Sequence, residues 1–504
     1  MRSRRIPLTG IYNTRISLSN NAASASGIVG IGIVGIMIVG ANNSATDKDE
    51  RYINCMYLTR GMMADKSAAY YIIKRPGYAT LNTPAAGNIG TAIMVWTGQG
   101  TGQKVISAFG PTNSTIYDGT ASLGAITGKC NGITETFVST TATLVISSGD
   151  STGWYYDTVS LLTKIADAQF PGNNGKTTTG TFAHMDGYAF IMDTEGAIWN
   201  SDLNSITSWT ALGYLSANAY PDKGIGVIRY KNQIVAFGRE SVQFFYNAGN
   251  ATGSPLSRID TATLKVGCIN ADALAQISDV LFWVGGGPQG GSTVYMYDGT
   301  TNRISPPEID FQLLLAGPDN ISLTTEKYYG RAFVVIKANA TTYVYCVEEK
   351  KWHERTATTP LWYKSAGLSS GTQIFTYSIS NMSTAGKVYV INPTALDFRD
   401  DTVAFTATIQ SANDDMGTQD VKFHHELRIM ADIESTSSPL TVSYSDDDYA
   451  TFVTYGTVDL SLGDRFRKIT RLGSSVKRAW KFAHSSNTQF RISGFEEKVS
   501  IGKS

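Results

Sequence analysis

Five histidines are the side chains of this chain best suited to metal binding or proton transfer. They stand singly except for one adjacent pair, and neighbouring residues of a strand point to opposite faces of the sheet. The five are His184, His353, His424, His425 and His484. The sequence therefore predicts no metal site and no bound cofactor.

The cysteines are also scattered, with no two at the spacing of metal ligands or of a dense disulfide framework. They are Cys55, Cys130, Cys268 and Cys346. We interpret them as free buried thiols, because an unpaired cysteine behaves as a small apolar side chain. The basic start of the chain leads into a polar stretch rather than an apolar signal sequence, so we expect synthesis in a reducing cytoplasm.

Two motifs with catalytic potential fail in their context. Gly367 to Gly371 reads GLSSG, but a nucleophilic serine turn needs a helix after it, and the following TQIFTYSI reads as a strand. The glycine-rich run from Val284 to Gly291 lacks the Lys and the Ser or Thr that phosphate binding requires. We predict that both are turns and that the protein is not an enzyme.

Two clusters of like charge lie in the last sixty residues. Asp446 to Asp448 form a compact acidic turn, which we interpret as a solvated hairpin tip because calcium-loop spacing is absent. The second cluster is basic, with no acid inside it: Arg465, Arg467, Lys468, Arg471, Lys477, Arg478 and Lys481. It is either a solvated face or a subunit rim, or a contact with phosphates or an acidic partner ring. Between the last two we favour the partner.

An apolar run near the start, GIVGIGIVGIMIVG from Gly27 to Gly40, is flanked by polar stretches. It is shorter than the ~20 residues of a spanning helix, and its glycines and β-branched residues weaken a helix further, so we expect no stable membrane insertion. One interpretation is a buried strand, hairpin or interface loop; the other is a gate formed by several copies in a ring. The candidate gate residues are Gly27, Ile28, Val29, Ile31, Ile33, Val34, Ile36, Met37, Ile38 and Val39.

The composition indicates a folded, β-rich chain. Of 504 residues, 42% are hydrophobic and 17% charged, and 49 glycines against 14 prolines favour turn-rich β-structure. Basic and acidic residues number 42 each, so no global field attracts nucleic acid or an acidic membrane.

A recurring phrase gives the architecture. An aromatic strand ending in Asp, Asn or Glu returns every 39 to 51 residues, close to the ~40 to 50 of a four-stranded propeller blade. Its anchors are Tyr117, Tyr156, Trp199, Tyr246, Tyr297, Tyr345 and Tyr389. We predict an all-β chain with a β-propeller of about seven blades, six to eight being open, over residues 91–400. Residues 1–90 form an N-terminal extended segment with the apolar insertion 27–40, and 401–504 a C-terminal β-sandwich.

Several stretches resemble the packaged-DNA stabilisation proteins, or tail nozzle proteins, of short-tailed phages. They are SDLNSITSW from Ser201 to Trp209, the Pro221-Asp222 pair, AFGRESVQFFYNAG from Ala236 to Gly249, GCINADA after it, and pieces of Glu50–Tyr78 and Arg471–Phe495. The first also resembles the Asp-box of sialidases, a structural turn, with Asn204 and Ser205 where glycine is expected. The apolar insertion does not match the family.

The resemblance implies a structural virion protein. It would be a homo-hexamer below the portal-adaptor proteins, sealing packaged double-stranded DNA and conducting it without sequence specificity, with a tail needle or fibre as distal partner. It would be assembled in the host bacterial cytoplasm and end in the virion tail. The alternative is a lectin-like carbohydrate-binding propeller, and a third reading is a sialidase-like hydrolase.

Overall fold

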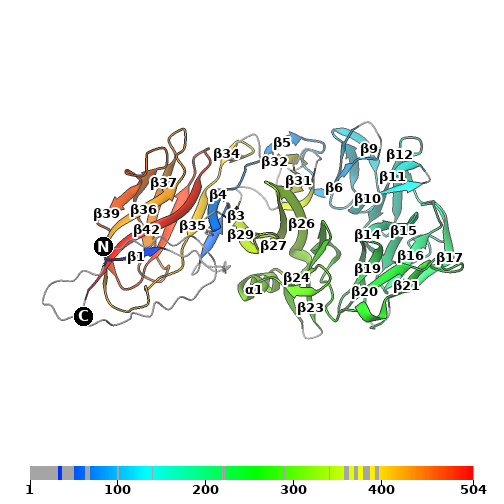
Figure 1. The fold of residues 1–504 in the computed structure, drawn as a ribbon. Coiled ribbons are helices and arrows are strands. Elements are labelled where there is room, and N and C mark those ends of the chain that lie inside the picture. Colours follow the sequence, from blue (N-terminus) through cyan, green and yellow to red (C-terminus); the bar gives the residue numbers. More distant parts are fainter. Residues whose placement is uncertain are drawn as a thin grey trace. The chain divides into compact units, whose positions relative to one another are not determined.

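The computed structural model describes residues 32–36, 50–62, 68–98, 102–138, 140–217, 219–220, 222–287, 290–339, 341–356, 362–367, 373–377, 386–391 and 397–502. The chain divides into two compact units. Unit 1 comprises residues 1–78, 343–358 and 394–504, and unit 2 comprises 79–342 and 359–393. Figure 1 draws both in the colours of the sequence.

Unit 2 is a β-propeller whose blades follow one another in chain order (Figure 1). Blade 1 has β6 (Gly90–Trp96), β7 (Lys104–Phe109), β8 (Thr115–Asp118) and β9 (Ala121–Ala125). Blade 2 has β10 (Cys130–Val138), β11 (Thr141–Ser148), β12 (Gly153–Asp157) and β13 (Leu161–Lys164). Blade 3 has β14 (Thr178–Met185), β15 (Tyr188–Asp193), β16 (Ala197–Ser201) and β17 (Trp209–Ser216). Each is an antiparallel sheet joined by hairpins.

The remaining blades continue the series. Blade 4 has β18 (Gly224–Tyr230), β19 (Gln233–Gly238), β20 (Val242–Asn247) and β21 (Leu256–Arg258). Blade 5 has β22 (Leu274–Ile277), β23 (Val280–Gly287), β24 (Gly290–Tyr297) and β25 (Thr301–Arg303). Blade 6 contributes β26 (Ile321–Tyr328) and β27 (Arg331–Ala338) to this unit. Blade 7 has β30 (Trp362–Gly367), β31 (Gln373–Tyr377) and β32 (Val388–Ile391).

The strand alternation explains how the blades hold together. Leu144 and Val145 are neighbours on β11, yet Leu144 packs in a cluster with blade 1 and Val145 in a cluster with blade 3. On β15, Phe190 and Ile191 divide in the same way between blades 4 and 2. Successive residues of a strand point to opposite faces, so each blade buries both faces against its neighbours.

An N-terminal strand completes blade 7 and thereby closes the ring. β5 (Ala79–Asn82) pairs antiparallel with β32, with Thr80 opposite Tyr389. The first strands of the blades lie inward: β6 contacts β10 and β30, β10 contacts β14, and β26 contacts β22 and β30. The propeller is therefore closed by residues from the two ends of its chain segment.

The described helices are few and short. α1 (Pro307–Ala316) and the 3-10 turns η1 (Asp260–Ala262), η2 (Ala271–Ala273) and η3 (Pro318–Asn320) all lie between the strands of blades 4 to 6. α1 turns Ile309 and Leu313 inward and leaves Phe311, Leu314 and Leu315 exposed.

Unit 1 contains two packed sheets. One has β3 (Cys55–Met62), β4 (Ala68–Lys74), β42 (Arg491–Ile501), β36 (Lys422–Ala431) and β39 (Lys468–Thr470), with β1 (Gly32–Ile36) beside β42 and β40 (Ser474–Ser475) beside β36. The other has β29 (Lys351–Arg355), β2 (Arg51–Ile53), β35 (Ala407–Gln410), β41 (Ala479–His484), β37 (Pro439–Ser445) and β38 (Val453–Asp459). β33 (Arg399–Asp400) and β34 (Val403–Ala404) form a small hairpin, and β28 (Thr341–Cys346) crosses the unit boundary.

The core of unit 1 lies between these sheets. Leu427 and Phe495 from one sheet meet Val442 and Phe482 from the other, and the Phe482 and Phe495 rings stack with centroids 3.8 Å apart. Such an apolar layer between two faces is the core of a β-sandwich. The N-terminal strands β2, β3 and β4 are part of it.

The predicted fold is confirmed: the chain is all-β, with a multi-bladed propeller and a sandwich. All seven aromatic anchors lie on corresponding strands, the third of each set of four: β8, β12, β16, β20, β24, β28 and β32. The sequence period is therefore the blade period.

Candidate functional site

The propeller carries a charged cluster around Asp272, which lies in η2 just before β22. Asn270 caps η2, its side-chain oxygen accepting the N–H of Ala273 at 2.6 Å. The buried Cys268 thiol donates to the carbonyl of Asn270 at 3.1 Å. Gly267 is required before it, because a Cβ there would lie 2.1 Å from the carbonyl carbon of Arg239. These contacts fix the position of Asp272.

Two lysines from other blades pair with this carboxylate. Lys364 on β30 places its Nζ 2.8 Å from Oδ1 of Asp272, and Lys129, just before β10, places its Nζ 3.5 Å from Oδ2. A third, Lys337 on β27, is part of the same electrostatic group: burial lowers its pKa, Asp272 opposes that shift, and Lys129 adds to it.

These ion pairs cross the middle of the propeller. Lys129 precedes blade 2, Asp272 precedes blade 5 and Lys364 belongs to blade 7, and no two of these blades are neighbours. The first strands line the centre, so contacts between such blades must span it. The central channel is therefore obstructed at this level by Asp272 and its lysines.

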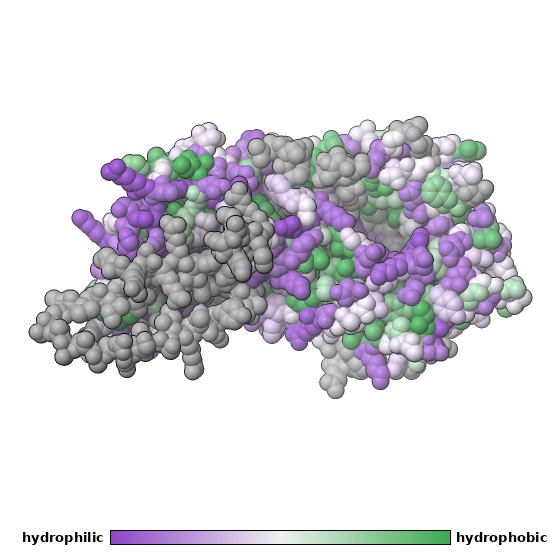
Figure 2. Space-filling view, viewed as in Figure 1, coloured by the Kyte–Doolittle hydropathy of each residue, from purple (hydrophilic) through white to green (hydrophobic). Residues whose placement is uncertain are grey.

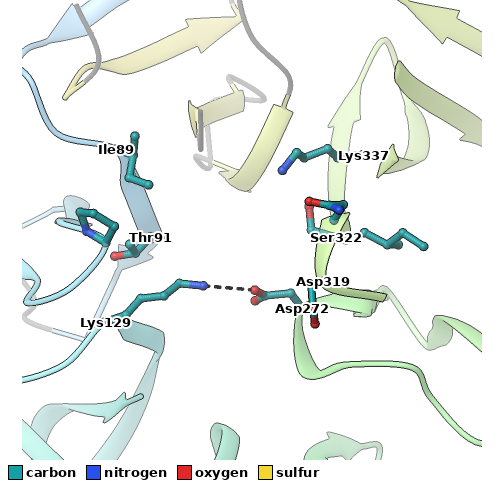
Figure 3. A pocket seen from close by; sticks show the side chains of 11 residues that line it. Ile89, Thr91, Lys129, Asp272, Asp319, Ser322 and Lys337 are labelled. Atoms are coloured by element: carbon teal, nitrogen blue, oxygen red, sulfur yellow. Dashed lines mark hydrogen bonds and ion pairs between the residues drawn. The ribbon is translucent and has the colours of Figure 1, made fainter. Parts of the chain in front are cut away.

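Two cavities adjoin the cluster and share Lys129, Asp272 and Asp319. Their volumes are about 220 and 290 Å³. Figure 3 shows Lys129 reaching across the first cavity to Asp272, with Lys337 extending into it from the opposite side. No aromatic side chain lines either cavity, and the first contains the buried hydroxyl of Ser322. Sequence reasoning missed this cluster, because its members are far apart in the chain.

The Ser201–Trp209 turn is held together by hydrogen bonds around Asp202. The Asp202 carboxylate accepts the hydroxyls of Ser208 and Thr210, and the Asp202 N–H donates to the Ser208 carbonyl at 2.9 Å. Asn204 has φ +55°, the left-handed conformation that glycine adopts most easily. The buried Trp209 ring meets Phe170 edge-on. The turn is structural, locking β16 to β17.

The predicted basic residues lie in unit 1 but do not form one patch. Arg467 and Arg478 are buried: Arg467 donates to the carbonyl of Asp432, and Arg478 pairs with Asp446 at 2.6 Å. Lys477 pairs with Asp448 at 3.0 Å, so the basic segment and the acidic turn neutralise each other in part.

The other four basic residues are at least partly accessible. Lys468 lies 3.1 Å from Glu426, and Lys481 lies over the Phe452 ring. Arg465 and Arg471 are exposed. The surface that this segment offers to a partner is therefore smaller than its sequence suggested.

Of the predicted gate segment, Gly32–Ile36 forms β1, paired antiparallel with Glu496–Ser500 of β42. The other gate residues lie outside the described residues, as does most of the GLSSG motif. The gate assignment stays a prediction.

The histidines are dispersed, and the four cysteines are buried and free. His424 is the most connected, with Nδ1 2.5 Å from Glu497 and Nε2 2.8 Å from Ser475. Within the described ranges, no group of three or more His, Cys, Asp or Glu residues is arranged to hold a metal ion. In the same part of the chain, no helix is long and apolar enough to cross a membrane.

The described residues thus form a β-propeller and a β-sandwich. The family model described as "Bacteriophage P22 Gp10, beta-propeller" matches residues 44–386, and the chain belongs to this family of phage stabilisation proteins. No curated protein matches the chain.

Some solved structures are similar to the chain, all with TM-scores below 0.5. The WD40 repeats of RRP9 are 9% identical, with a TM-score of 0.41, over 63% of this chain and 99% of that chain. The WD40 propeller domain of Doa1 is 12% identical, with a TM-score of 0.39, over 63% and 97%. The extracellular domain of a putative one component system from B. thetaiotaomicron is 10% identical, with a TM-score of 0.42, over 71% and 43%.

Proposed function

We propose that the chain is a subunit of a hexameric tail nozzle ring. The ring attaches below the portal and adaptor proteins, seals packaged DNA in the capsid and later forms part of the ejection channel. Family membership over residues 44–386 carries this proposal, because it supports a structural role in the virion. The subunit assembles in the host cytoplasm and remains in the virion tail, where a needle or fibre contacts the ring.

The DNA path in this proposal lies between subunits. The Lys129–Asp272–Lys364 ion pairs cross the propeller's own channel. A DNA duplex could not pass through that channel without breaking them. A lumen shared by several copies gives DNA a route without opening any propeller. This arrangement needs closed ring symmetry, in which each copy presents the same inward surface.

Two surfaces are proposed as contacts in the ring. The apolar segment 27–40 would meet its copies as a gate, and the accessible members of the basic segment, among them Arg465 and Arg471, would face the adaptor. Three parts, 1–90, 91–400 and 401–504, remain our proposal for the functional division of the chain.

The test is the mass and shape of the purified protein, alone and with the portal-adaptor complex, by mass photometry and negative-stain imaging. Six copies forming a tube below the adaptor are expected. A protein that stays monomeric and does not bind the adaptor contradicts the proposal and favours the carbohydrate-binding alternative. Turnover of a fluorogenic glycoside would instead favour a hydrolase.

A further inference from the structure

The first cavity beside Asp272 has the chemistry of a binding site that the ring function does not use. Ser322 is 3% exposed and its hydroxyl has no hydrogen-bond partner among the described residues. Ser322 stands opposite Lys337 in the β26–β27 register, and both line the cavity. A buried hydroxyl without a partner costs roughly 1–3 kcal/mol, and a ligand that moves the neighbouring side chains enough to reach this oxygen would remove that cost.

The charges around the cavity favour an acidic ligand. Lys129 and Lys337 line the cavity with Asp272 and Asp319, so the charges of the lining itself balance. Lys364, outside the lining, pairs with Asp272 at 2.8 Å, and the three lysines against two aspartates give this group of five side chains one net positive charge. The Asp272 carboxylate already bridges two of these lysines, Lys129 and Lys364. A ligand oxyanion could pair with lysines of the group in the same way.

The size and polarity of the lining favour a hydroxylated ring over a bare ion. A cavity of about 150 Å³ can hold a benzene ring. The 220 Å³ here therefore admits a six-membered ring with substituents. Asp319 and Asn320 offer polar groups for ring hydroxyls, whereas the Thr91 hydroxyl on the facing wall (Figure 3) already donates to the carbonyl of Ala108 at 3.2 Å. The ligand class that meets these conditions is an acidic monosaccharide.

We infer that this cavity of the propeller binds an acidic sugar, with the acid group between Lys129 and Lys337 and the ring hydroxyls on Ser322, Asn320 and Asp319. The charge can be a carboxylate or a phosphate, since both present several oxygens to ammonium groups. This site lies within one subunit and does not depend on ring assembly.

The experiment is titration of the full-length purified protein with glucuronate, glucose 6-phosphate, glucose and inorganic phosphate, followed by calorimetry. Glucuronate or glucose 6-phosphate should bind at least tenfold more tightly than glucose and than inorganic phosphate, a difference of about 1.4 kcal/mol. The better of the two sugars identifies the acid group. Binding should weaken at least tenfold in Lys337→Gln and measurably in Ser322→Ala.

The matched control is Lys176→Gln, which removes a lysine whose partner Glu195 is largely exposed; neither residue lines either cavity. It should bind like the unaltered protein. Thermal melting of each variant separates lost binding from lost folding, and Ser322→Ala serves if Lys337→Gln does not fold. The inference is overturned if neither acidic sugar binds at millimolar concentration, if glucose binds equally well, if phosphate alone binds as tightly, or if folded Lys337→Gln binds unchanged.

Discussion

Arg75 and Asp400 form a buried, bidentate ion pair within unit 1. Nη1 and Nη2 of Arg75 lie 2.8 and 2.6 Å from the two carboxylate oxygens of Asp400, and both side chains are at most 3% exposed. Arg75 also donates from Nε to Asn54 at 2.9 Å, and its guanidinium stacks on Phe405. The pair ties the N-terminal strands to the C-terminal part of the sandwich.

Removing either partner should be costly. We expect Arg75→Ala and Asp400→Ala each to lower the free energy of unfolding of unit 1 by about 3–5 kcal/mol, because each leaves a buried charge unpaired. The double variant should cost much less than the sum. Arg399→Ala is the control, since the Arg399–Asp397 pair is exposed and should contribute about 1 kcal/mol or less. Urea unfolding measures all four; equal losses in Asp400→Ala and Arg399→Ala contradict the expectation.

A second prediction concerns closure of the propeller by β5. Proline at Thr80 lacks the N–H of a paired strand, so Thr80→Pro should detach β5 from β32 and expose the edge of blade 7. Hydrogen exchange in residues 386–391 should rise strongly. Leu81→Ala, at a side chain that is 45% exposed, should leave it nearly unchanged. Unaltered protection in Thr80→Pro would show that β5 does not hold the ring shut.

The blades could be predicted from the sequence because each is made locally. Tyr156, Trp199 and Tyr246 recur on corresponding strands, and each strand pairs with its neighbours in the chain, so the period survives in the sequence. The sequence also indicated the positive φ of Asn204, because this residue stands where glycine is expected in an Asp-box.

The long-range contacts could not be predicted in this way. Asp272 and Lys364 are ninety-two residues apart, and only closure of the ring brings them together. The strands β2 to β4 complete a sandwich whose other strands come mostly from the C-terminal part of the chain. No local sequence pattern predicts that these distant strands pair. The run from Arg465 to Lys481 looked like one patch because the sequence does not show that Arg467 and Arg478 are buried.

A third prediction tests the Ser201–Trp209 turn of blade 3, which resembles an Asp-box. Asp202→Ala removes the acceptor of two hydroxyl groups, so the turn should lose about 1–3 kcal/mol of local stability. Hydrogen exchange of peptides covering β16 and β17 measures this loss. Asp260→Ala is the matched control, because its pair with Arg258 is exposed and worth about 1 kcal/mol or less. Equal exchange in the two variants would mean that the box adds nothing to the hairpin.

The last prediction follows from the buried His484 in unit 1. Burial lowers the pKa of His484 to about 4, and its Nε2 lies 2.8 Å from the hydroxyl of Ser438. In the unfolded chain the pKa of this histidine is about 6.5. Between pH 4 and pH 6.5 the histidine is therefore mostly protonated in the unfolded state and mostly neutral in the folded state. The stability that the neutral, buried His484 contributes to the free energy of unfolding is therefore fully present above pH 6.5. It is lost as the pH falls toward 4, by at most about 1.4 kcal/mol per pH unit. Urea unfolding from pH 7 to pH 4 should give a shallower decline in His484→Gln than in the unaltered protein. The exposed His425 provides the control, and His425→Gln should keep the original slope. A slope that His484→Gln leaves unchanged would assign the acid sensitivity of the sandwich to other groups, among them His353, whose pKa burial lowers to about 3.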